Sequence, residues 1–292
     1  MSNEAQLRND IVEVGRRLWV RGFVASNDGN ISVRLDASRL LMTPASVSKG
    51  FMTPDMMVIT DLEGNLLAGA PGRKPSSETQ MHLVVYRNRP DVQAVVHSHP
   101  PLSTGFAVAG IPLDRAVLAE VVTTLGSIPI AEYGTPSTME LANAVEPYVR
   151  LHDGLLLANH GALALGTDLF AAYYKMETIE HFAKISLVAR MLGREHVLSK
   201  EEVTRLQALR GAYGIAVPAP ICPDPALSGD RVTAEAADCQ VLQAADAPGE
   251  RLVADTSVAG GPGIAIGTGG EIRLTYDQLT ALVEEAVKQI TQ

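Results

Sequence analysis

The sequence predicts an α/β fold in which a mixed sheet is covered by helices. Short apolar runs alternate as strands do, longer segments carry apolar residues at helical spacing, and capping residues open several of those segments. The strand-like runs first follow one another and then alternate with helices. We therefore expect one compact domain over residues 1–214, a Pro/Gly/Ala-rich linker over 215–272 and an amphipathic helix over 273–292.

The first part of the chain predicts one helix followed by two hairpins. Apolar residues at helical spacing indicate an amphipathic helix over residues 4–21. The alternating run 31–35 pairs with the run 40–44 in the first expected hairpin, and a second hairpin is expected to turn around 63–65.

The rest of the domain predicts helices that alternate with strands. A capping box of Ser77 and Gln80 is expected to open a helix that ends near Arg89. The remaining expected elements are a strand over 94–97, a helix over 112–125, a strand over 128–130, a helix opened by Ser137 and Glu140, strands over 154–160 and 162–166, and helices opened by Asp168 and by Ser199.

The composition is that of an ordinary globular protein, with 292 residues, of which 46% are hydrophobic and 20% charged. The formal net charge of −9 argues against nucleic acid or an anionic membrane as a partner. Cys222 and Cys239 follow no metal-binding spacing, and so few cysteines indicate a reducing compartment. No basic, apolar leader and no apolar run of ~20 residues is present, so we expect a cytoplasmic protein.

Two histidines end the central apolar run, as His97-Ser98-His99. Side chains two residues apart on a strand share one face, so both imidazoles are expected to reach the same point in space. This arrangement is what a metal site needs, although two histidines can also simply end a strand.

Three further features add to this possible site. His160 ends a second apolar strand, and Glu78 begins a helix, so three imidazoles and a carboxylate would give the ligand set of a catalytic zinc. Ser76 and Ser77 at the helix start, and the turn around Gly29, offer hydroxyl and N–H groups to an anion. Each feature also has a simpler interpretation: a structural histidine, helix caps and an ordinary turn.

The order and spacing of these motifs over about residues 4–214 resemble the class II aldolase/adducin family. The likeness is nearest to the branch that cleaves L-fuculose phosphate. The motifs are Gly29-Asn30-Ile31-Ser32, Thr43-Pro44, Pro75-Ser76-Ser77-Glu78, Val95-Val96-His97-Ser98-His99, Tyr133 with Glu140-Leu141-Ala142, and Asn159-His160-Gly161.

The resemblance implies a fold, an assembly and a set of site residues. The fold would be a three-layer αβα arrangement with a mainly antiparallel sheet, and the assembly a cyclic homotetramer with sites between subunits. The resemblance implies that a phosphorylated sugar is the substrate and that Glu78 is both a resting ligand and the acid/base. The implied metal is Zn²⁺ or another divalent transition metal, held by His97, His99, His160 and Glu78, and the implied phosphate ligands are Gly29, Asn30, Ser76 and Ser77.

Two residues leave the reaction type open. Tyr213, in Ala212-Tyr213-Gly214, resembles the tail tyrosine that completes a neighbouring site, and it is the candidate proton donor to the aldehyde oxygen. The second catalytic tyrosine of the aldolases is missing from 112–125. Glu120 occupies that stretch as either a second acid/base or an exposed helix residue, so decarboxylation or dehydration stays an alternative to aldol cleavage. A non-catalytic role, as in the adducin branch, is disfavoured by the metal ligands.

The segment after residue 214 departs from the family pattern. Its Gly/Pro/Ala-rich linker and terminal helix resemble the encapsulation peptides that target enzymes to the shell of a bacterial microcompartment. The apolar stripe of the helix could equally bury itself on the enzyme's own surface or on a neighbouring subunit. That stripe comprises Leu279, Leu282, Val283, Ala286, Val287 and Ile290.

Overall fold

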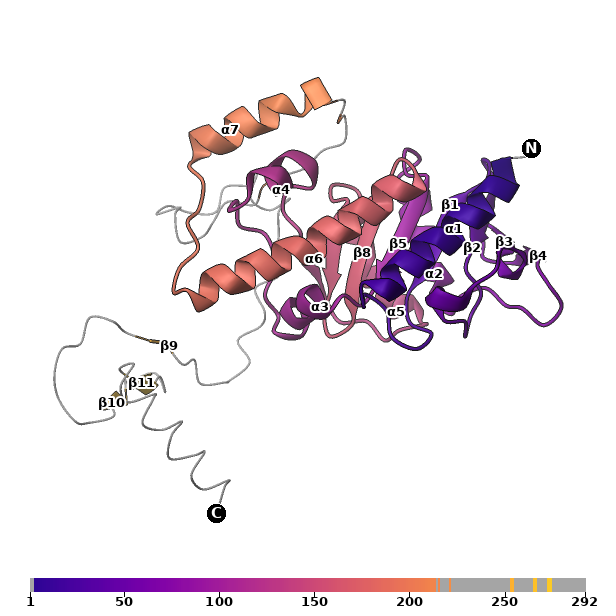
Figure 1. The fold of residues 1–292 in the computed structure, drawn as a ribbon, viewed down its shortest axis with the longest axis horizontal. Helices are drawn as coiled ribbons and strands as arrows, with labels where there is room; N and C mark the ends of the chain where they lie inside the picture. The colour runs from indigo at the N-terminus through magenta and orange to yellow at the C-terminus, as the bar shows by residue number, and fades with distance from the viewer. Residues whose placement is uncertain are drawn as a thin grey trace, which may run out of the picture. The chain divides into compact units, whose positions relative to one another are not determined.

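A computed structural model describes residues 3–213, 215, 221, 253–254, 265–266 and 272–274. The chain divides into two units, Met1–Leu242 and Gln243–Gln292. The first contains a central sheet with helices on both faces, as predicted (Figure 1). Its strands are β1 Asn30–Arg34, β2 Arg39–Met42, β3 Val58–Asp61, β4 Leu66–Ala68, β5 Ala94–Ser98, β6 Ile130–Ala131, β7 Gly154–Leu157 and β8 Gly161–Gly166.

The eight strands are ordered β4-β3-β2-β1-β5-β8-β7-β6. All neighbours pair antiparallel except β6 and β7, which are parallel, so the sheet is mixed but mainly antiparallel, as expected. β5 lies at the centre between β1 and β8. The register places Asn30 opposite His97 and Ser32 opposite Val95, which fixes which β1 side chains share a face with the first histidine.

Two hydrophobic clusters occupy the two faces of the sheet. One cluster joins Val96 and Ala164 to apolar residues of the first and sixth helices, and the other joins Val95 and Leu163 to those of the second and fifth. Alternate residues of β5 and β8 therefore face opposite layers, which confirms the three-layer arrangement. The helices are α1 Asn3–Val20, α2 Thr79–Asn88, α3 Pro101–Val108, α4 Ala119–Thr124, α5 Met139–Val149, α6 Leu169–Met191 and α7 Lys200–Leu209.

Several helix starts differ from the predictions. The first residue of α2 is Thr79, so Glu78 occupies the N-cap position and the expected box of Ser77 and Gln80 does not form. Thr138, not Ser137, caps α5 by accepting the N–H of Glu140. Ser137 instead takes a left-handed conformation with φ 67°. Asp168 and the Ser199–Glu202 box cap α6 and α7 as predicted.

The helix predicted over 112–125 is mostly absent. Only α4, Ala119–Thr124, is helical, because Leu113 pairs with Ile128 in an isolated antiparallel bridge. Two bonds hold this bridge, each joining the N–H of one residue to the carbonyl of the other. α3 follows β5 directly and was not predicted, since its short apolar sequence lacks a helical polar face.

Short 3-10 helices complete the first unit, and short strands are described in the second. The 3-10 helices are η1 Lys49–Phe51, η2 Pro54–Met56 and η3 Gly211–Tyr213. In the second unit, β9 Val253–Ala254, β10 Ala265–Ile266 and β11 Ile272–Leu274 form a sheet in the order β10-β11-β9. The predicted linker thus contains short strands, and most of the predicted terminal helix, residues 275–292, lies outside the described residues.

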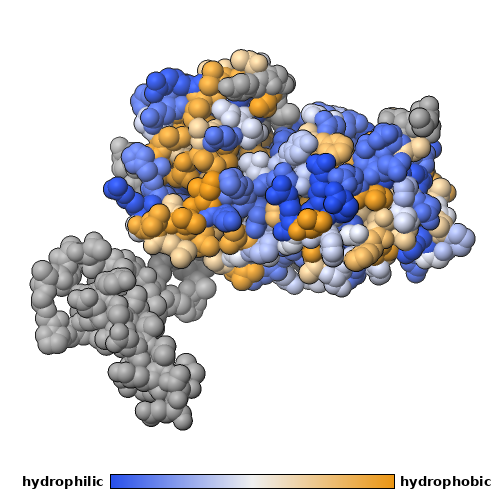
Figure 2. All heavy atoms as spheres, viewed as in Figure 1, coloured by the Kyte–Doolittle hydropathy of each residue, from blue (hydrophilic) through white to orange (hydrophobic). Residues whose placement is uncertain are grey.

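Apolar side chains also reach the surface of the first unit. Figure 2 shows apolar surface around the end of α6 and the neighbouring α4 and α7. Met191 and Leu192 at the end of α6 are 79% and 80% exposed. No helix in the described part of the chain is both long and apolar enough to cross a membrane.

Candidate metal centre

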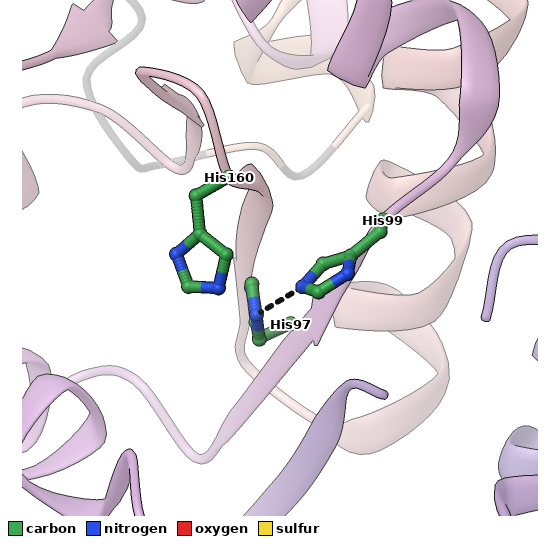
Figure 3. A group of neighbouring side chains, drawn as sticks. All are labelled: His97, His99 and His160. Carbon is green, nitrogen blue, oxygen red and sulfur yellow. Dashed lines mark hydrogen bonds between the residues drawn. The ribbon is translucent and has the colours of Figure 1, made fainter. Parts of the chain in front are cut away.

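Three histidines from two distant segments converge at one end of the central strands. His97 lies on β5 and His99 just after it, while His160 lies in the tight turn between β7 and β8. Their ring centroids are 4.8–4.9 Å apart, and one nitrogen from each ring lies within 4.8 Å of the others (Figure 3). The structure therefore brings His160 to His97 and His99, although His160 lies 61 residues after His99 in the sequence.

The backbone of the turn explains how His160 reaches the other two. Asn159 adopts the left-handed conformation with φ 55°, which turns the chain sharply after β7. Gly161 follows, and a Cβ there would lie 2.6 Å from both the His99 ring and the Ser98 carbonyl oxygen. In the Asn159-His160-Gly161 motif, Asn159 meets the geometry of the turn, and Gly161 allows the close approach of His99 and Ser98.

Glu78 completes the cluster from the α2 side of the sheet. Its Oε1 lies 3.1 Å from Nε2 of His160, and its Oε2 lies 3.3 Å from Nε2 of His97. Burial by itself raises the pKa of Glu78, but charge and hydrogen-bond interactions with His97 and His160 lower that pKa below its usual range. The carboxylate is therefore ionised and directed at the imidazoles.

The imidazole tautomers fit a divalent cation. Nδ1 of His97 donates to the Ala162 carbonyl oxygen over 2.9 Å, which leaves its Nε2 to face Nε2 of His99 at 3.1 Å. Asp28 lies 3.4 Å from Nδ1 of His99 and orients that ring from behind. Burial, followed by the proximity of His97 and His160, lowers the pKa of His99 to about 3. Three imidazole nitrogens that converge beside a carboxylate form an N₃O set suited to zinc.

A second layer of polar residues supports Glu78, and sequence reasoning missed most of it. Asn30 donates its Nδ2 to Glu78 Oε2 over 2.7 Å, and its Oδ1 is bonded to Nε2 of His82. Nδ1 of His82 is bonded to Ser32, which also meets the hydroxyl of Tyr86. The signal was available, because Asn30 and Ser32 have strand spacing while Glu78, His82 and Tyr86 have helical spacing.

The predicted anion ligands lie beside this cluster and differ in exposure and in the hydrogen bonds that they already make. Gly29 has φ 72°, and a Cβ there would lie 2.8 Å from the His97 carbonyl oxygen, so the turn requires glycine. Ser77 is exposed, whereas Ser76 accepts the N–H of Glu78 over 3.3 Å. Asn30 is 3% exposed, and both ends of its amide already hold partners, so the structure gives it a supporting task beside Glu78.

Neither of the two remaining candidates makes a described contact with the cluster. Glu120 is exposed in the first turn of α4, where its carbonyl oxygen accepts the hydroxyls of Thr123 and Thr124. Tyr213 ends η3, and its side chain lies outside the described part of the chain. Both roles stay predictions.

The fold and this centre define an α/β domain with a candidate divalent-metal site at the end of its central strands. Residues 9–187 match the model of the Class II Aldolase and Adducin N-terminal domain, and the chain belongs to this family.

Similar proteins carry two kinds of lyase name. An L-fuculose phosphate aldolase of Methanococcus maripaludis is 33% identical over 63% of this chain and 97% of its own length. A 3-oxo-tetronate 4-phosphate decarboxylase of Haemophilus influenzae is 32% identical over 60% of this chain and 84% of its own length. A solved L-fuculose 1-phosphate aldolase is 30% identical with a TM-score of 0.65, covering 70% of this chain and 95% of that one.

Proposed function

We propose that this protein is a zinc-dependent aldolase that cleaves a deoxyketose 1-phosphate. The proposed substrate is L-fuculose 1-phosphate, and the products are dihydroxyacetone phosphate and L-lactaldehyde. The observation that carries this proposal is the convergence of His97, His99 and His160 with the ionised Glu78. The aldolase names of similar proteins support the reaction type.

The protein's own residues supply the binding and proton transfers of this reaction. Bound zinc would supply Lewis-acid stabilisation of the negative charge that develops on substrate oxygens as the C3–C4 bond breaks. Glu78 is ionised and largely buried beside that point, so in the condensation direction it would take the proton of C3, while the Tyr213 phenol would donate its proton to the aldehyde oxygen. Cleavage reverses both transfers: the Tyr213 phenolate takes the proton of the C4 oxygen, and the protonated Glu78 gives its proton to C3.

The substrate phosphate needs a local site in a chain with a net charge of −9. The proposed site combines the backbone of the Gly29 turn with Ser76, Ser77 and the remaining N–H of Asn30. Ser77 is exposed and the backbone of the Gly29 turn is half-buried, which supports access of an anion to both.

A second candidate function is decarboxylation or dehydration of a related sugar acid or sugar phosphate. The decarboxylase name of the Haemophilus influenzae relative favours it. In this alternative Glu120 would serve as a second acid or base, and the metal centre would be the same.

One assay separates the two candidates. Purified protein is incubated with L-fuculose 1-phosphate and, separately, with 3-oxo-tetronate 4-phosphate, and dihydroxyacetone phosphate and carbon dioxide are measured. The aldolase proposal predicts dihydroxyacetone phosphate from the first substrate. Carbon dioxide from the second, with no cleavage of the first, would replace it. Metal analysis of freshly purified protein tests the centre itself, and absence of zinc together with unchanged stability after chelation would argue for a binding protein.

Two partner proposals accompany the activity. The first is a homo-oligomer, a tetramer with sites between subunits, and the exposed apolar residues at the end of α6 support such an interface. The second is attachment to a microcompartment shell through residues 273–292. Deleting 275–292, which leaves β11 intact, separates the outcomes: lost shell association with intact assembly supports targeting, and a dissociated oligomer supports docking within the enzyme.

A further inference from the structure

The polar residues behind Glu78 form one continuous line of hydrogen bonds inside the protein. Asn30 and Ser32 lie on the same face of β1, and His82 lies one helical turn after Glu78 on α2. Ser32 and His82 are 0% exposed, and Asn30 is 3% exposed. Water therefore cannot replace a missing partner, so each of these groups must find one within the protein.

The direction of every bond in this line follows from the carboxylate. An ionised carboxylate only accepts, so Asn30 must donate its Nδ2 to Glu78 and present its Oδ1 to His82. Nε2 of His82, 2.5 Å away, must then carry the hydrogen. Nδ1 of His82 is left as an acceptor, and the Ser32 hydroxyl donates to it over 2.6 Å.

We propose that Ser32 and His82 are positioning residues that hold the Asn30 amide in one orientation and so aim the Glu78 carboxylate at the metal centre. The Ser32 hydroxyl fixes the His82 tautomer, and that tautomer accepts only one of the two amide orientations of Asn30. With the other orientation, Oδ1 of Asn30 would face the Glu78 carboxylate oxygen at hydrogen-bond distance and repel it. The proposal rests on the proposed metal centre and is independent of the substrate.

A purely structural role for this line makes a different prediction. Buried hydrogen bonds between β1 and α2 would then matter only for stability, whichever hydroxyl is removed. Tyr86 provides the matched control, because its hydroxyl, also buried, contacts Ser32 at 2.8 Å and makes no hydrogen bond to His82 among the described contacts. Removing it leaves Ser32 able to donate to His82.

The test compares Ser32→Ala, Ser32→Thr and Tyr86→Phe by Zn²⁺ affinity, measured by competition with a chelator. We expect Ser32→Ala to lower the affinity by about 10–100-fold, as loss of an orienting partner does at other metal centres. Ser32→Thr restores the hydroxyl and should recover most of the loss, and Tyr86→Phe should change the affinity less than about threefold. Equal losses in Ser32→Ala and Tyr86→Phe, or no loss in either, would overturn the proposal.

A second measurement addresses the tautomer directly. ¹⁵N spectra of imidazoles distinguish a protonated from an unprotonated ring nitrogen, and we expect hydrogen on Nε2 of His82 in the wild-type protein and a change of tautomer population in Ser32→Ala. Hydrogen on Nδ1 in the wild type would refute the bond directions. If the wild type binds no Zn²⁺, the proposed function fails, and these spectra still decide the arrangement of Ser32, His82 and Asn30.

Discussion

Two largely buried clusters of titratable side chains lie in the same domain and differ in whether their members satisfy one another. In the first, Arg89 bonds to Asp153 over 2.9 Å and Lys175 bonds to the same carboxylate over 2.6 Å. Arg89 also donates to Asp91 and to the Val149 carbonyl oxygen, and Lys175 also donates to the Leu165 carbonyl oxygen. This cluster is closed, since cations and carboxylates alternate.

The second cluster, His97, His99, His160 and Glu78, is open. Its nitrogens face one another at distances as short as 3.1 Å, and Nδ1 of His160 is buried without a hydrogen-bond partner among the described residues. Acceptors that face acceptors require a proton or a cation between them. The difference teaches that matched donors and acceptors mark a structural cluster, whereas converging lone pairs mark a site for an ion.

The largest effect is expected from His97→Ala, which disrupts the open cluster. His97→Ala removes a proposed ligand whose Nδ1 is anchored on the Ala162 carbonyl oxygen. We expect a loss of Zn²⁺ affinity greater than the ~10–100-fold loss that follows substitution of a residue that only orients a ligand. Competition with a chelator measures it, and metal binding as tight as in the wild type would remove His97 from the ligand set.

Glu78→Gln is expected to separate catalysis from metal binding. The amide keeps the size of the side chain but cannot exchange the proton, so turnover should fall by about 10²–10⁴-fold. The three imidazoles remain, so most of the metal content should persist. Steady-state kinetics and metal analysis of the same sample test this, and full turnover would refute the acid/base role.

Asp153→Asn is the matched disruption of the closed cluster. It leaves Arg89 and Lys175 without their shared carboxylate, and removing one partner of a buried pair costs about 3–5 kcal/mol of stability. Urea unfolding measures the loss, while Zn²⁺ affinity should stay as in the wild type. Weaker metal binding with unchanged stability would contradict the assignment of this closed cluster to stability alone.

The smallest effect on stability is expected at Lys49, a buried cation that contrasts with the paired Arg89 and Lys175. It is 2% exposed, and its Nζ donates to the carbonyl oxygens of Asn27 and Val47, with no carboxylate hydrogen-bonded to it among the described residues. Burial lowers its pKa from 10.5 to about 8. Between these pH values the unfolded chain binds the proton and the folded protein does not, so this residue makes the folded state more stable as pH rises.

The free energy of unfolding should show this as a difference between wild type and Lys49→Met. That difference is expected to rise by at most about 1.4 kcal/mol per pH unit between the folded and unfolded pKa values, and to stay flat below them. Denaturant unfolding at a series of pH values measures it. A difference that falls with pH would mean that burial does not control the charge of Lys49.

The sequence predicted the convergence of these side chains better than the contacts that support it. His97 and His99 follow from strand periodicity alone, and Glu78 from its place at a helix start. The position of His160 was a weaker inference, because it depends on the left-handed Asn159 and on the absence of a Cβ at Gly161. Such tertiary contacts are not visible in local periodicity.

The errors have similar causes. The helix expected over 112–125 was shortened by the bridge between Leu113 and Ile128, a pairing between residues 15 apart that competes with local helix propensity. The supporting role of His82 was missed because its partners, Asn30 and Ser32, lie on β1, about 50 residues earlier. Long-range register decides both, and one sequence does not specify register by itself.

The spacing of α2 has a consequence for how this domain can change over evolution. Glu78, His82 and Tyr86 follow one another at intervals of four, so the N-cap and one side of a single helix carry the carboxylate and the groups behind it. Inserting or deleting one residue between Glu78 and His82 would rotate everything after it by about 100° and detach His82 and Tyr86 from Glu78 together. Substitutions can alter these groups one at a time, but length changes in this segment should be tolerated only in the loop before the helix.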